Sequence, residues 1–212
     1  MAAKFRNAGQ TCVCANTFYV QARVAEAFTA KLVARVRALK VGDGLVPGTS
    51  IGPLISPAAV RAQAALVADA VAGGAKVETG GAALHMGGSS SRGNFFAPTV
   101  LTGLPLSAPC RVIGEEIFGP LAPIVAFEGE EEVLRAANAS RSGLAAYVYT
   151  GGSARAWRVG AALRVGMVGV NTGMISAAQA PFGGVKESGF GREGGRAGLL
   201  EYQATKYTMV GF

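Results

Sequence analysis

The sequence predicts an α/β fold in which a largely parallel, open sheet is flanked by helices. Segments rich in β-branched and aromatic residues alternate with segments whose apolar residues recur every three or four positions. Such alternation is typical of parallel strands that are joined by helices. The composition fits this fold class, because 50% of the 212 residues are hydrophobic and only 16% are charged, which is enough to form a buried core.

The chain begins with a predicted strand that is followed by a long helix. "TFYVQ" (17–21) is β-branched and aromatic, which favours a strand. Within 22–40, apolar residues step by three or four positions and charged residues fall between them, which indicates an amphipathic helix. The glycines and prolines of 41–56 then predict a loop.

A second helix has sequence signals at both ends. Ser56 followed by Pro57 is typical of an N-cap residue and a proline at the first helical position. The pair Gly73 and Gly74 predicts the end of this helix, because glycine is common just after a helix.

The remaining elements follow the same rules. We expect strands at 75–81, 95–101, 122–127, 145–149 and 167–171, helices at 130–139 and 153–163, and a small, polar, mobile loop at 87–93. Ser153 is expected to cap the helix that starts with it. The glycine-rich region 172–192 is predicted to be irregular, followed by a helix near 193–200 and a terminal strand at 205–210. The sequence shows no internal repeat and no linker that would divide it.

Charge and hydropathy exclude several classes of partner. The net charge of +7 and the pI near 9.7 raise the question of nucleic-acid binding. However, lysines and arginines are scattered and no aromatic platform is interleaved with them, so we interpret them as a solvated surface and expect no nucleic-acid partner. No apolar run reaches the roughly 18 residues of a membrane span, and the N-terminal residues lack the apolar stretch of a signal peptide. An intracellular protein is therefore expected.

Cysteine and histidine are too few for several kinds of site. Three cysteines do not make a disulfide framework. The single histidine, His85, lies in a stretch rich in glycine and serine and is interpreted as a solvated loop residue, so a Ser-His-Asp triad is not expected. A zinc site would need all three cysteines, two of them one residue apart, which is poor spacing for a tetrahedron. We therefore expect no metal site.

Cys12 has two interpretations from its local sequence. A thiol becomes a nucleophile where its pKa is lowered, for example at a helix N-terminus or near a cation. "NAGQTC" contains turn-formers and "VCAN" follows, which suits a turn leading into a short helix, and Arg6 lies six residues earlier. The alternative is a packed cysteine, since free cysteine is among the most buried residue types. Local features alone favour packing.

Two glycine- or acid-rich segments are further candidates. In "IGEEIFGPLAPIVAF" (113–127), Glu115 and Glu116 precede a turn and a buried strand. A carboxylate there could accept two hydrogen bonds from a vicinal diol such as that of ribose, and the alternative is a pair of exposed acids. Gly189–Gly194 formally spells GxGxxG, but no apolar strand runs into it and the chain ends before a ribose-binding acid could follow. We therefore do not interpret it as a dinucleotide fingerprint.

Three motifs in order along the chain resemble the aldehyde dehydrogenase superfamily. They are "FRNAGQTC", "GEEIFGP" and "PFGGVKESGFGREGG", and the resemblance extends from about residue 3 to the C-terminus. Within that superfamily, "KFRNAGQTCVC", "GPLAPIVAF" and "VGMVGVNTGMIS" are similar to the succinate-semialdehyde dehydrogenase branch, which acts in GABA degradation.

The resemblance implies a nucleophilic role for Cys12. In such a reaction, the thiolate adds to an aldehyde to give a thiohemiacetal, the oxyanion is held by backbone N–H groups, NAD or NADP accepts the hydride, and water hydrolyses the resulting thioester. The resemblance also implies two cofactor-binding residues, Glu116 at the nicotinamide-side ribose and Phe118 at the nicotinamide.

The resemblance further assigns substrate-binding and regulatory residues. It implies that Phe182 is a wall of the substrate pocket and that Arg6 and Ser176 hold the distal carboxylate of succinate semialdehyde, as a cation and a hydroxyl donor can. It also implies a redox switch in which Cys12 and Cys14 form a strained, reducible disulfide. The alternative is that Cys14 is a packed small residue. Cys110 belongs to no motif and is interpreted as structural.

The resemblance covers a C-terminal portion of the family's length. We expect 1–192 to be the catalytic domain and 193–212 a returning segment whose strand reaches a neighbouring subunit of a homodimer or homotetramer. The N-terminal cofactor domain is absent from the sequence, so the isolated chain is expected to be incomplete. The alternatives are a non-catalytic fragment that associates with full-length subunits and a thiol-reactive domain with residual esterase activity. Cytoplasm and mitochondrial matrix both remain open as the compartment.

Overall fold

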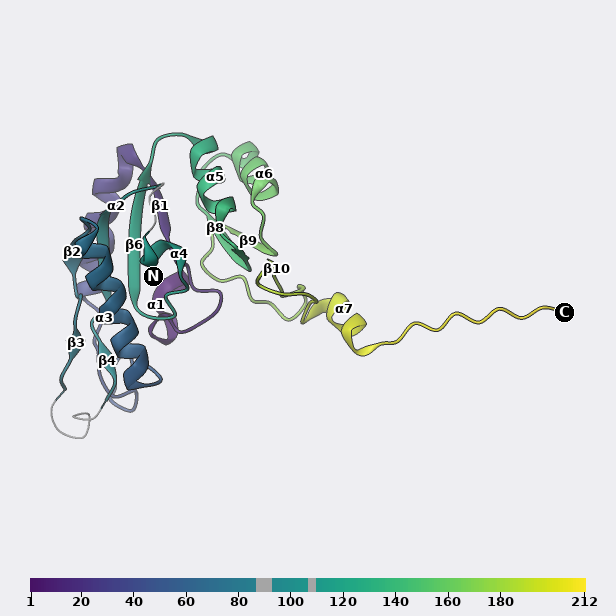
Figure 1. Cartoon of the computed structure of the whole chain (residues 1–212), viewed down its shortest axis with the longest axis horizontal. Helices are drawn as coiled ribbons and strands as arrows, with labels where there is room; N and C mark the ends of the chain where they lie inside the picture. The colour runs from purple at the N-terminus through teal and green to yellow at the C-terminus, as the bar shows by residue number, and fades with distance from the viewer. Residues whose placement is uncertain (87–92, 107–109) are drawn as a thin grey trace. The chain divides into compact units, whose positions relative to one another are not determined.

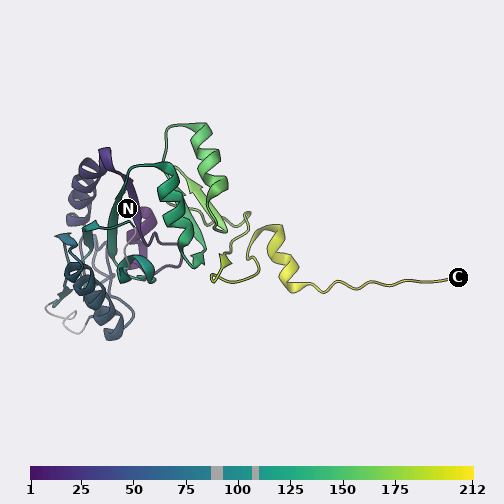
Figure 2. The same ribbon diagram turned by 45° about the horizontal axis from the view of Figure 1, so that its top comes forward.

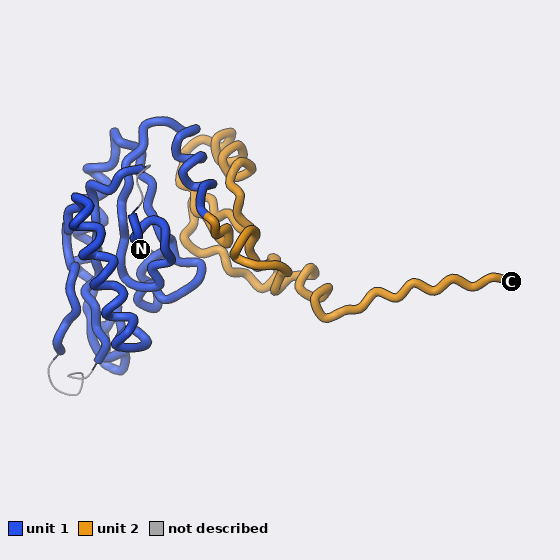
Figure 3. The backbone as a smooth tube through the Cα atoms, in the orientation of Figure 1, with its two compact units in different colours: residues 1–140 blue, residues 141–212 orange. Residues whose placement is uncertain are grey.

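The computed structural model describes residues 1–86, 93–106 and 110–212. These residues form two compact units, 1–140 and 141–212, which are coloured separately in Figure 3. No linker in the sequence predicted this division, and the predicted domain boundary between 192 and 193 stays a prediction. The predicted loop at 87–93 lies outside the described residues, apart from Gly93.

The first unit opens with two short helical turns, a strand and a long helix. These elements are α1 (Ala2–Phe5), η1 (Arg6–Gly9), β1 (Phe18–Gln21) and α2 (Ala22–Arg37). The predicted strand and amphipathic helix are thus confirmed to within a few residues. Leu32 and Val36 are buried on α2, which packs on β1 and on three further strands of the sheet.

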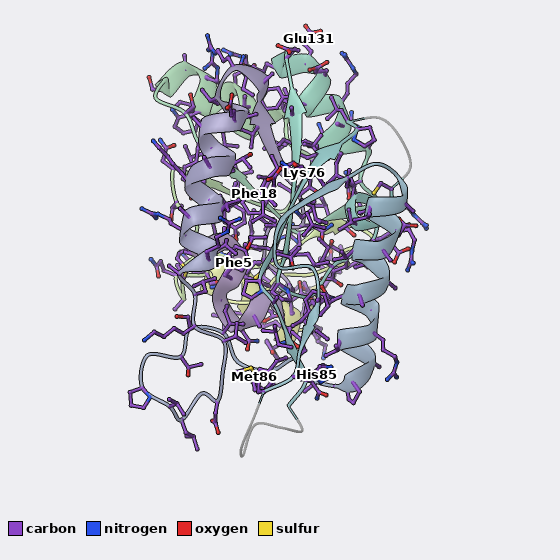
Figure 4. All side chains as sticks on the ribbon, turned by 90° about the vertical axis from the view of Figure 1, so that its left-hand side faces the viewer. Phe5, Phe18, Lys76, His85, Met86 and Glu131 are labelled. Atoms are coloured by element: carbon purple, nitrogen blue, oxygen red, sulfur yellow. The ribbon has the colours of Figure 1, made fainter. Side chains whose placement is uncertain are left out.

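Helix α3 (Pro57–Ala72) begins and ends as its sequence predicts. The Ser56 hydroxyl accepts a hydrogen bond from the Ala59 N–H at 3.2 Å, which satisfies one of the unpaired donors of the first turn. At the other end, Gly74 has a φ of +94°, a conformation that side chains with a Cβ rarely adopt. Figure 4 shows α2 on one side of the sheet strands and α3 on the other.

A four-stranded sheet forms the centre of the first unit (Figures 1 and 2). The further elements of this unit are β2 (Lys76–Thr79), β3 (Ala83–Leu84), β4 (Phe95–Phe96), β5 (Thr99–Leu104), α4 (Arg111–Gly114), β6 (Leu121–Phe127) and α5 (Glu130–Ala139). The strand order of the sheet is β1-β6-β5-β2, with β6 parallel to both β1 and β5, and β2 antiparallel to β5 at one edge. The predicted fold class is therefore confirmed, with one antiparallel edge strand on a parallel sheet.

The core of the first unit lies on both faces of β5 and β6. Val100 and Leu101 on β5 and Leu121 and Val125 on β6 are fully buried, as expected for parallel strands covered by helices. Phe5 is also buried and lies between α2 and α3 in Figure 4, so the segment just before Cys12 is anchored in the core.

The second unit is built around a parallel strand pair. Its elements are β7 (Ser142–Gly143), β8 (Ala145–Val148), α6 (Ser153–Ala162), β9 (Met167–Val170), β10 (Val185–Lys186), α7 (Gly195–Gly198) and η3 (Leu199–Tyr202). Strands β8 and β9 are parallel and joined through α6, and β7 pairs with β10 in an antiparallel ribbon. The irregular region and the short helix near 193–200 are confirmed.

Two local predictions in the second unit are wrong. Ser153 does not cap α6, because the N-cap residue is Gly152 and no side chain bonds to the free N–H groups there. Residues 205–210 do not form a strand; they are exposed and, within the described chain, have no strand to pair with. A strand needs a neighbour for its backbone hydrogen bonds, which local sequence cannot supply. Within the described residues, every helix is too short or too polar to span a membrane.

Candidate active site

Cys12 is exposed on a tight turn that follows three residues with left-handed backbone. Asn7, Ala8 and Gly9 have φ values of 49°, 55° and 78°. The Cys14 N–H then donates to the Thr11 C=O at 2.9 Å and closes the turn around Cys12. The predicted turn is therefore present, but the predicted helix after it is wrong. Left-handed alanine and asparagine store strain of a kind that clusters at functional sites.

Gly9 brings this thiol loop (residues 9–16) against the loop that contains the two glutamates. A Cβ on Gly9 would lie 2.1 Å from the Gly119 carbonyl oxygen, so only glycine permits this approach. We call residues 115–120 the acidic loop. The two motifs that were singled out far apart in the sequence thus touch through their backbones.

Gln10 ties the thiol loop to a second distant segment. Its Oε1 accepts a hydrogen bond from the Ile55 N–H at 2.8 Å. The residue directly before Ile55 is held as well, because the Leu54 N–H donates to the Asn94 C=O at 2.8 Å. The residue two positions before Cys12 is therefore fixed by a contact 45 residues away in the chain.

The structure distinguishes the two adjacent glutamates. Arg111 donates to both carboxylate oxygens of Glu115, at 2.7 and 3.1 Å, and this guanidinium lowers the pKa of the Glu115 carboxyl. The Glu116 side chain is exposed and has no hydrogen-bond or ion-pair partner among the described residues. Glu116 is therefore the carboxylate that is free to accept hydrogen bonds from a ligand.

Phe118 lies on the same acidic loop in an unusual conformation. Its φ is 45°, and 44% of its surface is exposed. A bulky residue in the left-handed region is an outlier that the surrounding structure has to maintain. An exposed aromatic ring in a fixed, strained position is suited to contact a flat ligand.

Asn16 and Gln63 are two residues of this region that sequence reasoning missed. The Asn16 side chain bonds to the acidic loop at two points, and Gln63 donates from α3 to the Ile117 C=O at 2.7 Å. Their partners are 54 to 101 residues away in the chain, so no local pattern could have revealed them.

The thiol loop contains a second cysteine, Cys14, and lies near a buried lysine, Lys4. Cys12, Cys14 and Cys110 are free thiols; Cys14 is half-buried, and Cys110 packs against the core, consistent with a structural role. Lys4 is only 1% exposed, and burial lowers its pKa to about 8, with the nearby Cys14 acting in the opposite direction. The Ala15 N–H donates to the Ala3 C=O at 2.7 Å and holds these two segments together.

The other predicted site residues divide between the two units. Arg6 belongs to the first unit and is half-buried. Ser176 and Phe182 belong to the second unit, where Ser176 is exposed and Phe182 exchanges two backbone hydrogen bonds of 2.7 Å with Glu193. The assignment of these three residues to one substrate pocket stays a prediction. His85 is exposed near the lower end of Figure 4, as expected for a solvated loop residue.

The first unit is thus an α/β unit that presents the exposed Cys12 thiol beside the acidic loop. The model of the aldehyde dehydrogenase family matches residues 1–208. The chain belongs to the aldehyde dehydrogenase family, as its three motifs predict.

Individual relatives agree with this membership. A probable succinate-semialdehyde dehydrogenase [NADP(+)] of Sinorhizobium fredii is 51% identical over 209 residues, covering 99% of this chain and 41% of the relative. The succinate-semialdehyde dehydrogenase [NADP(+)] GabD of Escherichia coli is 50% identical over 211 residues, covering 100% of this chain and 42% of that protein. The crystal structure of an E. coli NADP-dependent enzyme superposes with a TM-score of 0.94 at 49% identity, covering 100% of this chain and 42% of that one. The chain thus spans about two fifths of the length of these relatives.

Proposed function

We propose that this chain is the thiol-bearing part of an NAD(P)-dependent aldehyde dehydrogenase that oxidises succinate semialdehyde to succinate. The observation that carries the proposal is the direct backbone contact between the loop of exposed Cys12 and the loop of unpaired Glu116. A nucleophile and a diol-binding carboxylate are the two groups that such an oxidation needs close together. The relatives at about 50% identity support succinate semialdehyde as the substrate, because they are named succinate-semialdehyde dehydrogenases.

Cys12 would act as the covalent nucleophile. Its sulfur adds to the aldehyde carbon, and the oxyanion of the thiohemiacetal is held by backbone N–H donors, including that of Cys12. After oxidation the carbon remains bound to sulfur as a thioester, and water releases the acid and the thiol. The exposure of Cys12 on a fixed turn supports this role, because the sulfur is accessible while its backbone is held by Gln10 and Cys14.

The residues present fit a nicotinamide nucleotide. Both carboxylate oxygens of Glu116 would accept hydrogen bonds from a ribose diol, because Arg111 donates to the neighbouring Glu115 and not to Glu116. Phe118 offers an exposed ring on the same loop for the nicotinamide end. When bound, NAD or NADP supplies the acceptor for the hydride that leaves the substrate carbon.

The substrate carboxylate would be held by Arg6 and Ser176, with Phe182 as an apolar wall. A guanidinium and a hydroxyl provide charge-assisted hydrogen bonds to a carboxylate. The same pocket would favour aldehydes that carry a negative charge at the far end. Arg6→Met should therefore raise KM for succinate semialdehyde more than for an uncharged aldehyde of the same length.

We also propose that Cys12 and Cys14 form a redox switch. Both thiols are free, and the turn between Thr11 and Cys14 keeps them on the same loop. Oxidation by hydrogen peroxide would join the two sulfurs and yield two molecules of water, and the small ring would be strained and easily reduced. In Cys14→Ser, excess peroxide should oxidise Cys12 beyond the sulfenic acid to the sulfinic acid, which thiol reductants do not reverse, and unchanged reversibility would argue against the switch.

The domain arrangement and the assembly are part of the same proposal. Residues 1–192 would form the catalytic domain, and 193–212 would pair through 205–210 with another subunit of a homodimer or homotetramer. The exposure of this terminal segment supports such pairing. A non-catalytic chain that only associates with longer subunits is the alternative, which the same exposed segment favours.

The test is aldehyde oxidation by the 212-residue chain under reducing conditions. Succinate semialdehyde is supplied with NAD+ or NADP+, and the readouts are reduced nicotinamide and an acyl adduct at Cys12 detected by mass spectrometry. Adducts and reduced cofactor that disappear in Cys12→Ser, but not in Cys110→Ser, would show that these 212 residues carry out the oxidation through Cys12, and would contradict the expected incompleteness of the isolated chain. Neither product, with Cys12 still alkylated by iodoacetamide, is the result expected of an incomplete chain, and it would leave the oxidation to a longer protein or favour the non-catalytic alternative.

A further inference from the structure

We propose that Asn16 is a positioning residue that fixes the acidic loop against the thiol loop and so sets the place of Glu116 and Phe118. The functional meaning of this inference rests on the proposed cofactor role of those two residues. The geometric part stands on its own, because it concerns contacts within the first unit.

The side-chain amide of Asn16 holds both neighbours of Glu116. Its Nδ2 donates to the Glu115 C=O at 2.9 Å, and its Oδ1 accepts from the Ile117 N–H at 2.8 Å. A planar amide that makes both bonds at once fixes the direction of the backbone between its two partners. Glu116 therefore leaves the loop from a segment that is held on either side by one side chain.

Gln63 holds the same loop from α3. Its side chain is 2% exposed, and its Nε2 donates to the Ile117 C=O at 2.7 Å. Both backbone polar groups of Ile117 are thus occupied by side-chain amides from two different elements. A Cβ on Gly119 would lie 2.2 Å from Gln63, so the loop has no room to shift on that side.

This double attachment explains how Phe118 keeps a left-handed backbone. A non-glycine residue persists in that region only where neighbouring contacts determine it. Ile117 before it is bonded on both sides, and Gly119 after it is packed against Gly9 and Gln63. Loss of the two Asn16 hydrogen bonds would let the Phe118 backbone leave the left-handed region, and this would move the Phe118 ring and the Glu116 carboxylate together.

Asn16 also belongs to the thiol loop, four residues after Cys12. Its two hydrogen bonds to Glu115 and Ile117, which we call the Asn16 clamp, therefore join the thiol loop to the acidic loop, in addition to the Gly9 contact. Ligand-binding groups have to be held within about 0.5 Å of their productive place. Loss of the clamp is thus expected to weaken nucleotide binding without removing any group that touches the nucleotide.

Amide hydrogen exchange tests the clamp directly. In Asn16→Ala, exchange at Ile117 should become about 30-fold faster, as for the loss of two hydrogen bonds of ordinary strength. Asn16→Asp retains an acceptor for the Ile117 N–H but loses the donor to the Glu115 C=O, so it should restore only part of the protection there. A merely structural role would instead change protection throughout the unit.

Asn171→Ala is the matched control. Asn171 makes an equivalent pair of bonds, accepting from the Thr150 N–H and donating to the Thr150 C=O, both at 2.9 Å, in the second unit. The Asn171→Ala variant should leave the amide exchange rate at Ile117 unchanged. Equal exchange at Ile117 in the unmodified chain and in Asn16→Ala would overturn the proposal.

Calorimetric titration with NAD+ and NADP+ tests the functional part. We expect at least about tenfold weaker binding in Asn16→Ala and an unchanged affinity in Asn171→Ala. Faster exchange at Ile117 with an unchanged affinity would overturn the positioning role, and so would the absence of measurable nucleotide binding by the unmodified chain. If Glu116→Gln binds the nucleotide with the same affinity as the unmodified chain, Glu116 does not have the proposed ribose-binding role. The exchange rate at Ile117 alone decides whether Asn16 holds the acidic loop.

Discussion

Lys4 is a buried cation directly before the motif that contains Cys12. Only 1% of its surface is exposed, and removal from water disfavours the charged amine. Burial lowers its pKa from 10.5 to about 8, which corresponds to a penalty of about 3 kcal/mol on the folded state wherever the amine is charged.

The pH dependence of stability follows from this shift. Below about pH 8, Lys4 is protonated in both the folded and the unfolded chain, and the penalty is constant. Between about pH 8 and 10.5, the unfolded chain binds the proton and the folded chain does not, so this group makes the free energy of unfolding rise with pH. Lys4→Met should therefore gain most over the unmodified chain below pH 8.

Urea unfolding across this range is the measurement. The stability difference between Lys4→Met and the unmodified chain should shrink by up to about 3 kcal/mol between pH 8 and pH 10.5. Lys206→Met at an exposed position controls for the change of side chain. A difference that stays constant with pH would show that Lys4 is not the titrating group.

Gly9 is a residue whose replacement should disturb the site by sterics alone. Alanine there would combine a φ of +78° with a Cβ placed 2.1 Å from the Gly119 oxygen. Backbone strain and overpacking together should lower the free energy of unfolding by about 2–4 kcal/mol. Gly74→Ala is the matched control, because its φ is +94° but no atom lies within 4 Å of the new Cβ, and it should lose only about 1 kcal/mol. Equal losses in a thermal melt would refute the steric argument.

Sequence reasoning singled out Cys12 and Glu116 as candidate site residues but not the residues that hold their loops in place. Cys12 and Glu116 stand in motifs that can be read along the chain, whereas local features alone favoured a packed cysteine and left Glu115 and Glu116 equivalent. The structure separates the glutamates through Arg111, and it attaches their loop through Asn16 and Gln63. These contacts join residues that only the folded chain brings together, so a local sequence pattern cannot predict them.

Helix ends show where local sequence is sufficient. At α3, Ser56 combines with Pro57 and the hydroxyl caps the first turn. At α6, Ser153 lies one position inside the helix, and its hydroxyl makes no capping bond. A capping residue needs an extended backbone, which Gly152 supplies with φ of −100° and ψ of 118°. A shift of one residue therefore decides whether a serine stabilises a helix.

This contrast gives a paired prediction. Ser56→Ala should lower the free energy of unfolding by about 1 kcal/mol, because the Ala59 N–H loses its acceptor. Ser153→Ala should change it by less than about 0.5 kcal/mol, because no capping bond is lost. Chemical denaturation of both variants measures the difference. A loss at Ser153 equal to that at Ser56 would contradict the capping geometry described here.

The sequence predicted where strands lie along the chain, but it did not predict which strands pair with each other. The segments 17–21, 122–127 and 145–149 all became strands within two residues of their predicted ends. The order β1-β6-β5-β2 depends on pairings between residues far apart in the chain, such as Phe18 with Ile124 and Thr99 with Leu121, for which the sequence has no local signal. The terminal segment 205–210 has strand-forming residues but no neighbouring strand in the described chain, so propensity alone did not produce a strand.

The two compact units differ in how much apolar surface they bury. The hydrophobic core cluster lies entirely within residues 1–140. Residues 141–212 are all described, and the fully buried ones among them are glycines: Gly143, Gly169, Gly184 and Gly198. A glycine buries backbone but contributes no side chain to a core, so the second unit lacks the burial that stabilises the first.

Limited proteolysis of the native chain should reveal this difference. Regions with few buried apolar contacts open at low free energy, so trypsin should first cut the exposed terminal segment at Lys206 and then α6 at Arg155. Arg61 is equally exposed on α3, but α3 buries Leu66 and Val67 in the core, and cleavage there requires that core to open. We therefore expect a resistant fragment that ends near residue 140. Cleavage at Arg61 as fast as at Arg155 would mean that burial within this chain does not govern its local stability, and a second unit resistant to trypsin at high protein concentration but not at low concentration would show that another copy covers it.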